Sequence, residues 1–164
     1  YHRFTYHELV YNWYHDPEDA DSIVFKPSNN IKVCGFGTYA TRNGNPYKLV
    51  YRIVIDGNTV EKDEIIASDW VDNYFFKVRL NDSYLAPANS KIEIHTWSYD
   101  WGNSDHEIIT YHGRGGTEHK EIENEHRGLF EIEKCEAIDD NGITYYNDTR
   151  VFKGLINEIM YHVD

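Results

Sequence analysis

The stretch Ile31-Lys32-Val33-Cys34-Gly35-Phe36-Gly37-Thr38-Tyr39 decides the fold class of this chain. It follows a cluster of turn formers over residues 26–30, and its apolar and β-branched residues over 31–36 are typical of a β-strand. Gly35 and Gly37 at the end of this run leave room for a closely packed neighbour. The sequence therefore predicts a strand that another segment approaches closely.

Further strands are expected on both sides of this stretch. Residues 47–55 form a long β-branched and aromatic run, which Asp56-Gly57 closes with a strong hairpin signal before residues 59–60. Residues 91–97 alternate between apolar and polar side chains, as in a half-buried strand. The remaining predicted strands are 22–25, 74–80, 130–133, 143–145 and 155–163, with turns through Asn81-Asp82-Ser83 and Asp139-Asp140-Asn141-Gly142.

No stretch of a dozen residues shows a helical period with caps, so the short strands predict an all-β fold. We expect an antiparallel β-sandwich, built as a single domain over residues 1–164. Residues 98–127 are polar and rich in His, Glu and Gly, which predicts a long polar loop or insertion. The first residue is Tyr1 rather than Met, so we expect the chain to be a piece of a longer protein.

Composition and charge exclude several function classes. The 164 residues are 40% hydrophobic, a composition that folds, and 16 basic against 28 acidic side chains give a net charge of −12. Such an acidic chain has no overall attraction for phosphate backbones or anionic lipid, so nucleic acid is not the expected partner. No apolar run approaches the roughly 18 residues of a membrane span, and membrane insertion is not expected.

The two cysteines, Cys34 and Cys135, are far apart and lack the spacing of a metal motif. One disulfide is an open alternative, but two buried free thiols in a reducing compartment are the simpler interpretation. This interpretation predicts a cytoplasmic, intracellular protein.

Metal, cofactor and catalytic motifs are all weak. His106, His112, His119 and His126 lie among acidic residues, but none has a second histidine at zinc-ligand spacing. A solvated polar loop explains them, so no metal is predicted.

Residues 35–40 match the G-x-G-x-x-A pattern of dinucleotide-binding sites. That pattern binds the pyrophosphate only where a helix begins at the second glycine, and here a loop follows instead, so no cofactor is predicted. No G-x-S-x-G elbow appears, and neither cysteine has the context of a nucleophile, so no enzyme is expected.

Large aromatic residues gather after the strand at 91–97. Trp97, Tyr99, Trp101 and Tyr111 are close in sequence to Asp100. Aromatic side chains near loop tips anchor protein interfaces, and the same rings can stack on sugars. For Trp97 a simpler interpretation stands beside these, because a residue on an alternating strand can pack inside the fold.

From end to end, the chain resembles the PHR domain family, named for the PAM, Highwire and RPM-1 ubiquitin-ligase proteins. The family's G-F-G-x-Y strand is matched by Gly35 to Tyr39, and its terminal G-Q-I-P-x-I-x-Y strand by Gly154 to Tyr161. Asn157 replaces the proline of that motif, and Asp148 replaces the glycine of the family's N-G-T motif. The other matching segments are Arg3-Phe4, Trp13-Tyr14, Asp21 to Phe25, Tyr47 to Ile55, Tyr74 to Leu80, Leu85-Ala86-Pro87 and Tyr111 to Gly116.

This resemblance implies a β-sandwich, jelly-roll in type, that is non-catalytic and binds protein partners. In members with BTB domains it implies recruitment of partners or substrates for a ubiquitin-ligase adaptor. The residues expected to bind the partner are Trp97, Tyr99, Asp100, Trp101, Tyr111 and Arg114. Two alternatives stay open, namely a structural component of a large protein assembly and a carbohydrate-binding β-sandwich.

Overall fold

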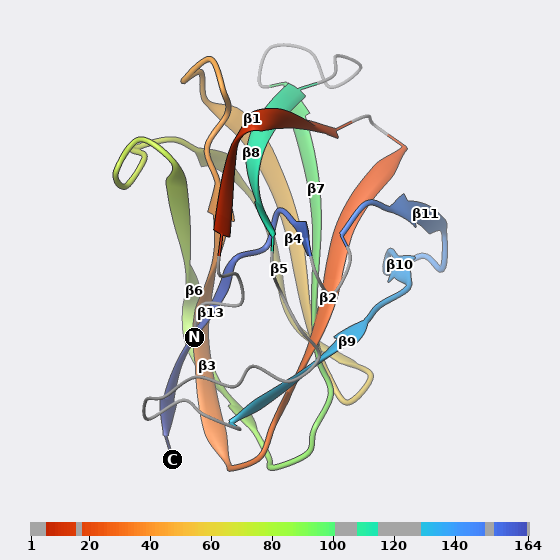
Figure 1. The fold of residues 1–164 in the computed structure, drawn as a ribbon. Helices are drawn as coiled ribbons and strands as arrows, with labels where there is room; N and C mark the ends of the chain where they lie inside the picture. Colours follow the sequence, from red (N-terminus) through yellow and green to blue (C-terminus); the bar gives the residue numbers. More distant parts are fainter. Residues whose placement is uncertain (1–5, 16–17, 101–107, 115–128, 150–152, 164) are drawn as a thin grey trace.

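The computed structural model describes residues 6–15, 18–100, 108–114, 129–149 and 153–163, and all regular structure among them is β (Figure 1). The strands are β1 (Tyr6–His15), β2 (Asp19–Pro27), β3 (Ile31–Tyr39), β4 (Tyr47–Ile55), β5 (Asn58–Ala67), β6 (Phe75–Ala86), β7 (Ile92–Asp100), β8 (Ile108–Arg114), β9 (Phe130–Lys134), β10 (Ala137–Ile138), β11 (Thr144–Asn147), β12 (Lys153–Gly154) and β13 (Glu158–Val163).

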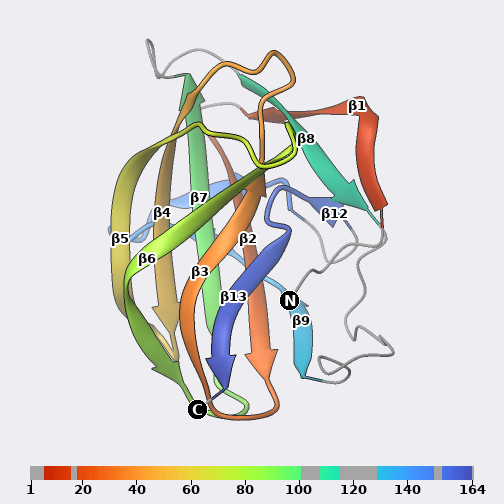
Figure 2. The same ribbon diagram turned by 90° about the vertical axis from the view of Figure 1, so that its left-hand side faces the viewer.

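Two sheets face each other, and a third lies at one end. The largest sheet has the order β10-β11-β2-β7-β4-β5, with β9 also paired to β2. The sheet β13-β3-β6 lies in front of it in Figure 2, and β1-β8-β12 forms the third sheet. The strand pairs are antiparallel apart from β11 and β2, which are parallel. The predicted β-sandwich is therefore confirmed.

Strand β4 shows why the sequence alternates as it does. Leu49, Tyr51 and Ile53 point into the sandwich and are buried, where Tyr51 meets Phe36 of the opposite sheet edge to face, with ring centroids 5.4 Å apart. The side chains between them point to the outer face of the sheet. The core that fills the sandwich also contains Ile23, Phe25, Ile31, Val33, Tyr47, Ile55, Val78, Ile92, Ile94, Phe130, Ile132, Ile156 and Ile159.

The glycines of β3 permit the close approach that the sequence predicts. A Cβ atom on Gly37 would lie 2.6 Å from Cγ of Glu158, and one on Gly35 would overlap the Val78 carbonyl oxygen and the Met160 side chain. Strand β13 can therefore pair with β3 at this point. Asn157 strengthens the junction, because its backbone N–H donates to the Gly37 carbonyl (3.0 Å) and its amide donates to the Thr38 carbonyl (2.9 Å).

The outer face of the large sheet is also covered. Strands β9, β10 and β11 follow one another along the edge of β2 (Figure 1). They bury a second, smaller cluster of Ala20, Trp97 and Ala137 against Val50, Tyr99 and Tyr145. In a sheet that is covered on both faces, successive side chains along a strand are all buried. Strand β2 fits this description, because it is buried at almost every position from Ala20 to Pro27.

Three sequence predictions were wrong in position. The stretch 98–127 was predicted to be a long polar loop or an insertion. Within it, residues 98–100 belong to β7 and residues 108–114 form β8, so these two segments are not loop; residues 101–107 and 115–127 lie outside the described residues. The turn predicted at Asn81-Asp82-Ser83 lies inside β6, where the pairing with β3 shifts register. His112, assigned to the polar loop, is buried on β8 against Trp13, with ring centroids 4.9 Å apart.

Two other predictions can be compared with the structure. Cys34 and Cys135 are both free thiols, as expected, although Cys34 is only partly buried. In the described part of the chain, no helix has the length and apolar character needed to span a membrane.

Candidate functional site

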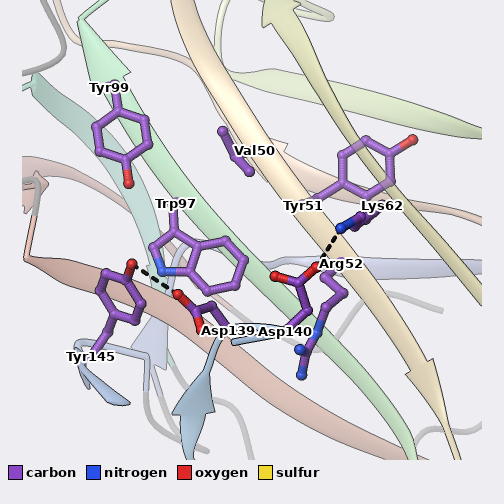
Figure 3. A pocket seen from close by; sticks show the side chains of 9 residues that line it. All are labelled: Val50, Tyr51, Arg52, Lys62, Trp97, Tyr99, Asp139, Asp140 and Tyr145. Atoms are coloured by element: carbon purple, nitrogen blue, oxygen red, sulfur yellow. Dashed lines mark hydrogen bonds and ion pairs between the residues drawn. The ribbon is translucent and has the colours of Figure 1, made fainter. Parts of the chain in front are cut away.

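A groove opens on the outer face of the large sheet, where the turn between β10 and β11 faces β4, β5 and β7 (Figure 3). We call it the outer-face groove. Its volume is about 190 Å³, below the roughly 300 Å³ at which small-molecule pockets usually begin. The groove therefore suits one or two side chains of a partner. Its lining residues are Val50, Tyr51, Arg52, Lys62, Trp97, Tyr99, Asp139, Asp140 and Tyr145.

The inner wall of the groove is aromatic. Trp97 and Tyr99 point to the same face because they alternate along β7, and Val50 on β4 pairs directly with Trp97. The Trp97 ring meets Tyr145 edge to face at 5.5 Å and stacks on His95 at 6.2 Å. Trp97 is only 6% exposed, whereas Tyr99 and Tyr145 are partly exposed. A ligand in the groove would therefore meet mainly the two tyrosines.

The opposite rim is a fixed polar turn. Asp139 Oδ1 accepts hydrogen bonds from the backbone N–H groups of Asn141 (2.9 Å) and Ile143 (3.0 Å), which closes the turn. Its Oδ2 accepts a 3.3 Å hydrogen bond from the Tyr145 hydroxyl. Burial, followed by the Asp139 charge, raises the pKa of Tyr145, so this hydroxyl remains a donor at neutral pH.

Asp140 and Lys62 pair at the exposed end of the groove. The hydrogen bond from Lys62, followed by its charge, lowers the pKa of Asp140, so the carboxylate is ionised at neutral pH. The Lys62 side chain is 63% exposed, and surface pairs of this kind contribute little stability. Either side chain can exchange its partner for a charged group of a ligand.

Two buried donors beside the groove have no hydrogen-bond partner among the described residues, namely Nε1 of Trp97 and Nε of Arg52. Buried N–H groups are nearly always paired with protein or water. Leaving one unpaired costs about 1–3 kcal/mol. Both nitrogens are buried from solvent, so a ligand in the groove meets the two tyrosines and not these donors.

The structure divides the predicted partner-binding residues. Trp97 and Tyr99 lie in the groove, and Asp100 pairs with Tyr47 at the end of β7. Tyr111 belongs to a different cluster, where it packs on Tyr74 at 5.0 Å. The predicted set therefore does not form one site. The backbone of Arg114 pairs with Tyr6 and Lys153, and Trp101 lies outside the described residues.

The sequence did not single out the groove's other polar residues. Arg52 and Lys62 are neighbours across β4 and β5. Arg52 was only a polar position on the strand predicted over 47–55, and Lys62 lay outside the predicted strands. Asp139 and Asp140 were recognised as turn formers, and that signal is correct for the turn itself. What places this turn over Trp97 is the parallel pairing of Tyr146 and Asn147 with Asp19 and Ala20, which no local pattern indicates.

A serine-protease-like arrangement also occurs, at the end of the sandwich. His15 Nε2 lies 2.8 Å from the Thr110 hydroxyl, and its Nδ1 lies 3.2 Å from Asp21. Asp21 also accepts hydrogen bonds from Trp13 (3.0 Å) and Thr149 (2.6 Å). Thr110 is fully buried and Asp21 is 2% exposed, so a substrate has no access to this hydroxyl. The network instead ties β1, β2 and β8 together.

Comparison with protein families gives one result that spans the chain. The family model described as the PHR domain matches residues 2–162, nearly the whole length. A comparison with curated proteins found no match.

Proposed function

The chain belongs to the PHR domain family, and we propose that it is the partner- or substrate-recruiting part of a ubiquitin-ligase adaptor of the BTB type. The family supports a protein-interaction module in general. The observation that carries the proposal further is the outer-face groove, in which partly exposed aromatic rings lie beside charged side chains.

The size and lining of the groove favour a short peptide segment as the occupant. Partly buried tyrosines are common anchors of protein interfaces because a large apolar ring carries a polar tip. Because the chain carries a net charge of −12, a basic partner segment is favoured by electrostatic steering, and its Lys or Arg can stack on Tyr99 or Tyr145.

Sugar binding has weaker support from the same site. A stacking platform for a sugar needs an exposed ring face, and Trp97 is 6% exposed. Assembly through a sheet face is supported by one specific observation, the 53% exposed Leu85 on β6 of the opposite sheet. The experiment below separates groove binding from docking on that face.

We also propose that the domain acts without catalysis and in a reducing compartment. The buried Thr110 hydroxyl supports the first point, and the two free thiols support the second.

The test is a peptide array and an affinity capture, both carried out with the full 164-residue chain. Four proteins are compared: wild type, Tyr99→Ala with Tyr145→Ala, Tyr146→Ala, and Leu85→Ser. Tyr146 is the matched control, because it follows Tyr145 on β11, is 63% exposed and does not line the groove. Unchanged thermal unfolding is required of each variant.

We expect basic peptides to bind wild type and Tyr146→Ala, and to lose at least tenfold in affinity for the groove variant, with weaker binding at higher salt. Groove-dependent capture of a protein that is a substrate of a ubiquitin ligase would support the adaptor role. Partners lost only in Leu85→Ser would overturn groove binding in favour of assembly through the sheet.

A further inference from the structure

Three metal-ligating side chains meet on the outer face of the large sheet, beside the wall of the groove. One ligand atom from each of Glu93, His95 and Cys135 lies within 4.8 Å of the other two. His95 is 1% exposed, Cys135 is 6% exposed and Glu93 is partly buried. A carboxylate, an imidazole and a thiol together form a donor set that zinc binds in proteins.

Strand geometry explains how residues 40 positions apart come together. Glu93 and His95 alternate along β7, so both side chains leave the same face of the sheet. His95 pairs with Ser22 on β2, and Lys134 at the end of β9 pairs with Ile23 on the other edge of β2. The next residue, Cys135, therefore comes level with Ser22 and His95 on the same side of the molecule.

The distances fit the edges of a zinc tetrahedron. With zinc bonds of about 2.3 Å to sulfur and about 2.1 Å to nitrogen or oxygen, tetrahedral angles place S and O about 3.6 Å apart and N and O about 3.4 Å apart. Cys135 Sγ lies 3.6 Å from Glu93 Oε1, and His95 Nε2 lies 3.3 Å from the same oxygen. Two of the ligand-to-ligand distances of a tetrahedral zinc site are therefore already present.

Residues behind the ligands hold them in place. The Ser22 hydroxyl lies 2.8 Å from Nδ1 of His95, a contact that can fix the tautomer with Nε2 available to a metal. The Asn147 amide donates to the backbone carbonyl of Cys135 (2.9 Å) and to that of Ser22 (3.0 Å), and its Oδ1 accepts the Ser22 N–H (2.9 Å). Supporting hydrogen bonds of this kind orient metal ligands in known zinc sites.

We propose that Glu93, His95 and Cys135 form a zinc-binding site, with the fourth tetrahedral position taken by water. A thiolate, a carboxylate and a neutral imidazole leave the site with no net charge once Zn²⁺ is bound, which suits its burial. In this proposal the Cys135 thiol loses its proton to solvent when the metal binds, while His95 keeps a single ring proton on Nδ1.

The competing interpretation is a purely hydrogen-bonded triad. In that case the Cys135 thiol and His95 Nε2–H both donate to Glu93, and no metal has affinity for the site. The zinc site requires the Cys135 thiol to give up its proton, whereas the hydrogen-bonded triad keeps it. Metal binding and proton release therefore distinguish the two.

The experiment uses the full chain, freed of metal with a chelator and then titrated with Co²⁺ and Zn²⁺. We expect one equivalent of Co²⁺ to give a thiolate-to-cobalt charge-transfer absorption together with the visible bands of a tetrahedral site, and Zn²⁺ to abolish both. Calorimetry in buffers of different ionisation enthalpy is expected to show one proton released per metal ion. A wild-type chain that gives no charge-transfer absorption with Co²⁺ overturns the proposal.

The two cysteines provide a matched pair of variants. Cys135→Ser is expected to lose the charge-transfer absorption and at least 100-fold in Zn²⁺ affinity, whereas Cys34→Ser retains both. Ser22→Ala tests the supporting contact, and its affinity is expected to fall about 10–100-fold with the absorption retained. Absorption that persists in Cys135→Ser, or that disappears in Cys34→Ser, contradicts the assignment. The wild-type titration decides the proposal even if a variant fails to fold.

Discussion

The Tyr84 hydroxyl on β6 donates a 2.7 Å hydrogen bond to Oε1 of Glu61 on β5, and this contact joins the edges of the two facing sheets. The same oxygen accepts the backbone N–H of Asn81 at 2.8 Å, and Oε2 accepts the Tyr51 hydroxyl at 2.5 Å. Glu61 is 7% exposed. One buried carboxylate on β5 therefore satisfies three donors from two other strands, β4 and β6.

Replacing Glu61 by Gln is expected to lower the free energy of unfolding by about 1–3 kcal/mol, because an amide nitrogen cannot accept and leaves at least one of these donors unpaired. Urea unfolding measures the difference. Glu64→Gln on the same strand is the control, since the Glu64 side chain is 58% exposed and a surface pair contributes about 0–1 kcal/mol. Equal losses in the two variants would show that the Glu61 contacts do not stabilise the sheet junction.

The stability of the protein should also fall at alkaline pH through these tyrosines. The hydrogen bond to Glu61, followed by burial, raises the pKa of Tyr84 from 10.0 to about 12. Because the pKa is higher in the folded state, the contribution is fully present below about pH 10 and is lost as the pH rises from about 10 through about 12. We expect unfolding free energy to decline with pH in this window, and to decline less steeply in Tyr84→Phe. Equal slopes would contradict this account.

Substituting Gly35 by Ala is expected to destabilise the fold by about 1–3 kcal/mol through overpacking. The added Cβ would overlap the Val78 carbonyl oxygen, a backbone atom that cannot move alone, as well as the Met160 side chain. Thermal unfolding measures the change. Gly57→Asn is the matched control: Gly57 has φ +82° with open space around it, and Asn tolerates that conformation. A Gly35→Ala variant as stable as this control would be evidence against close packing of β13.

Asn147→Ala is expected to cost about 2–4 kcal/mol, since four hydrogen bonds are lost and the Ser22 backbone groups are left without their partner. In the native chain the pairing of β9 with β2 ends at Ile23. Beside it, the Asn147 side chain makes the hydrogen bonds to the Ser22 backbone that a neighbouring strand would otherwise make. Amide hydrogen exchange at Ser22 should accelerate in the variant. Asn58→Ala, at an exposed position of the β4–β5 hairpin, serves as the control and should leave that exchange rate unchanged.

Much of the fold could be predicted from local patterns. The β4 bounds follow from its run of β-branched and aromatic residues, and Asp56-Gly57 adopts the positive φ angles of a tight hairpin, 48° and 82°. Strand β8 could not be predicted, because the polar residues Thr110 and His112 are buried in it. The hydrogen-bond partner of the Thr110 hydroxyl is His15, a residue 95 positions away. A partner so distant in the sequence cannot be inferred from the local pattern of apolar and polar residues.

The candidate site was predictable only in part, for the same reason. Trp97 and Tyr99 stood out as a local cluster of aromatics, but Tyr145 reaches them through the pairing of β11 with β2. The group of Glu93, His95 and Cys135 was likewise predictable only in part. Glu93 and His95 show the i, i+2 spacing of a strand face, whereas Cys135 joins them only through the alignment of β9, β2 and β7.

The cover of the groove is attached to the sandwich by little backbone. Strand β10 has two residues, and β11 pairs with β2 at only Tyr146 and Asn147. The turn from Asp139 to Ile143 closes on its own hydrogen bonds. Its length and sequence can therefore change without altering the strand pairing of the buried sheets. Recognition and folding can evolve separately in this domain, and a turn transplanted from one family member should carry its binding preference with it.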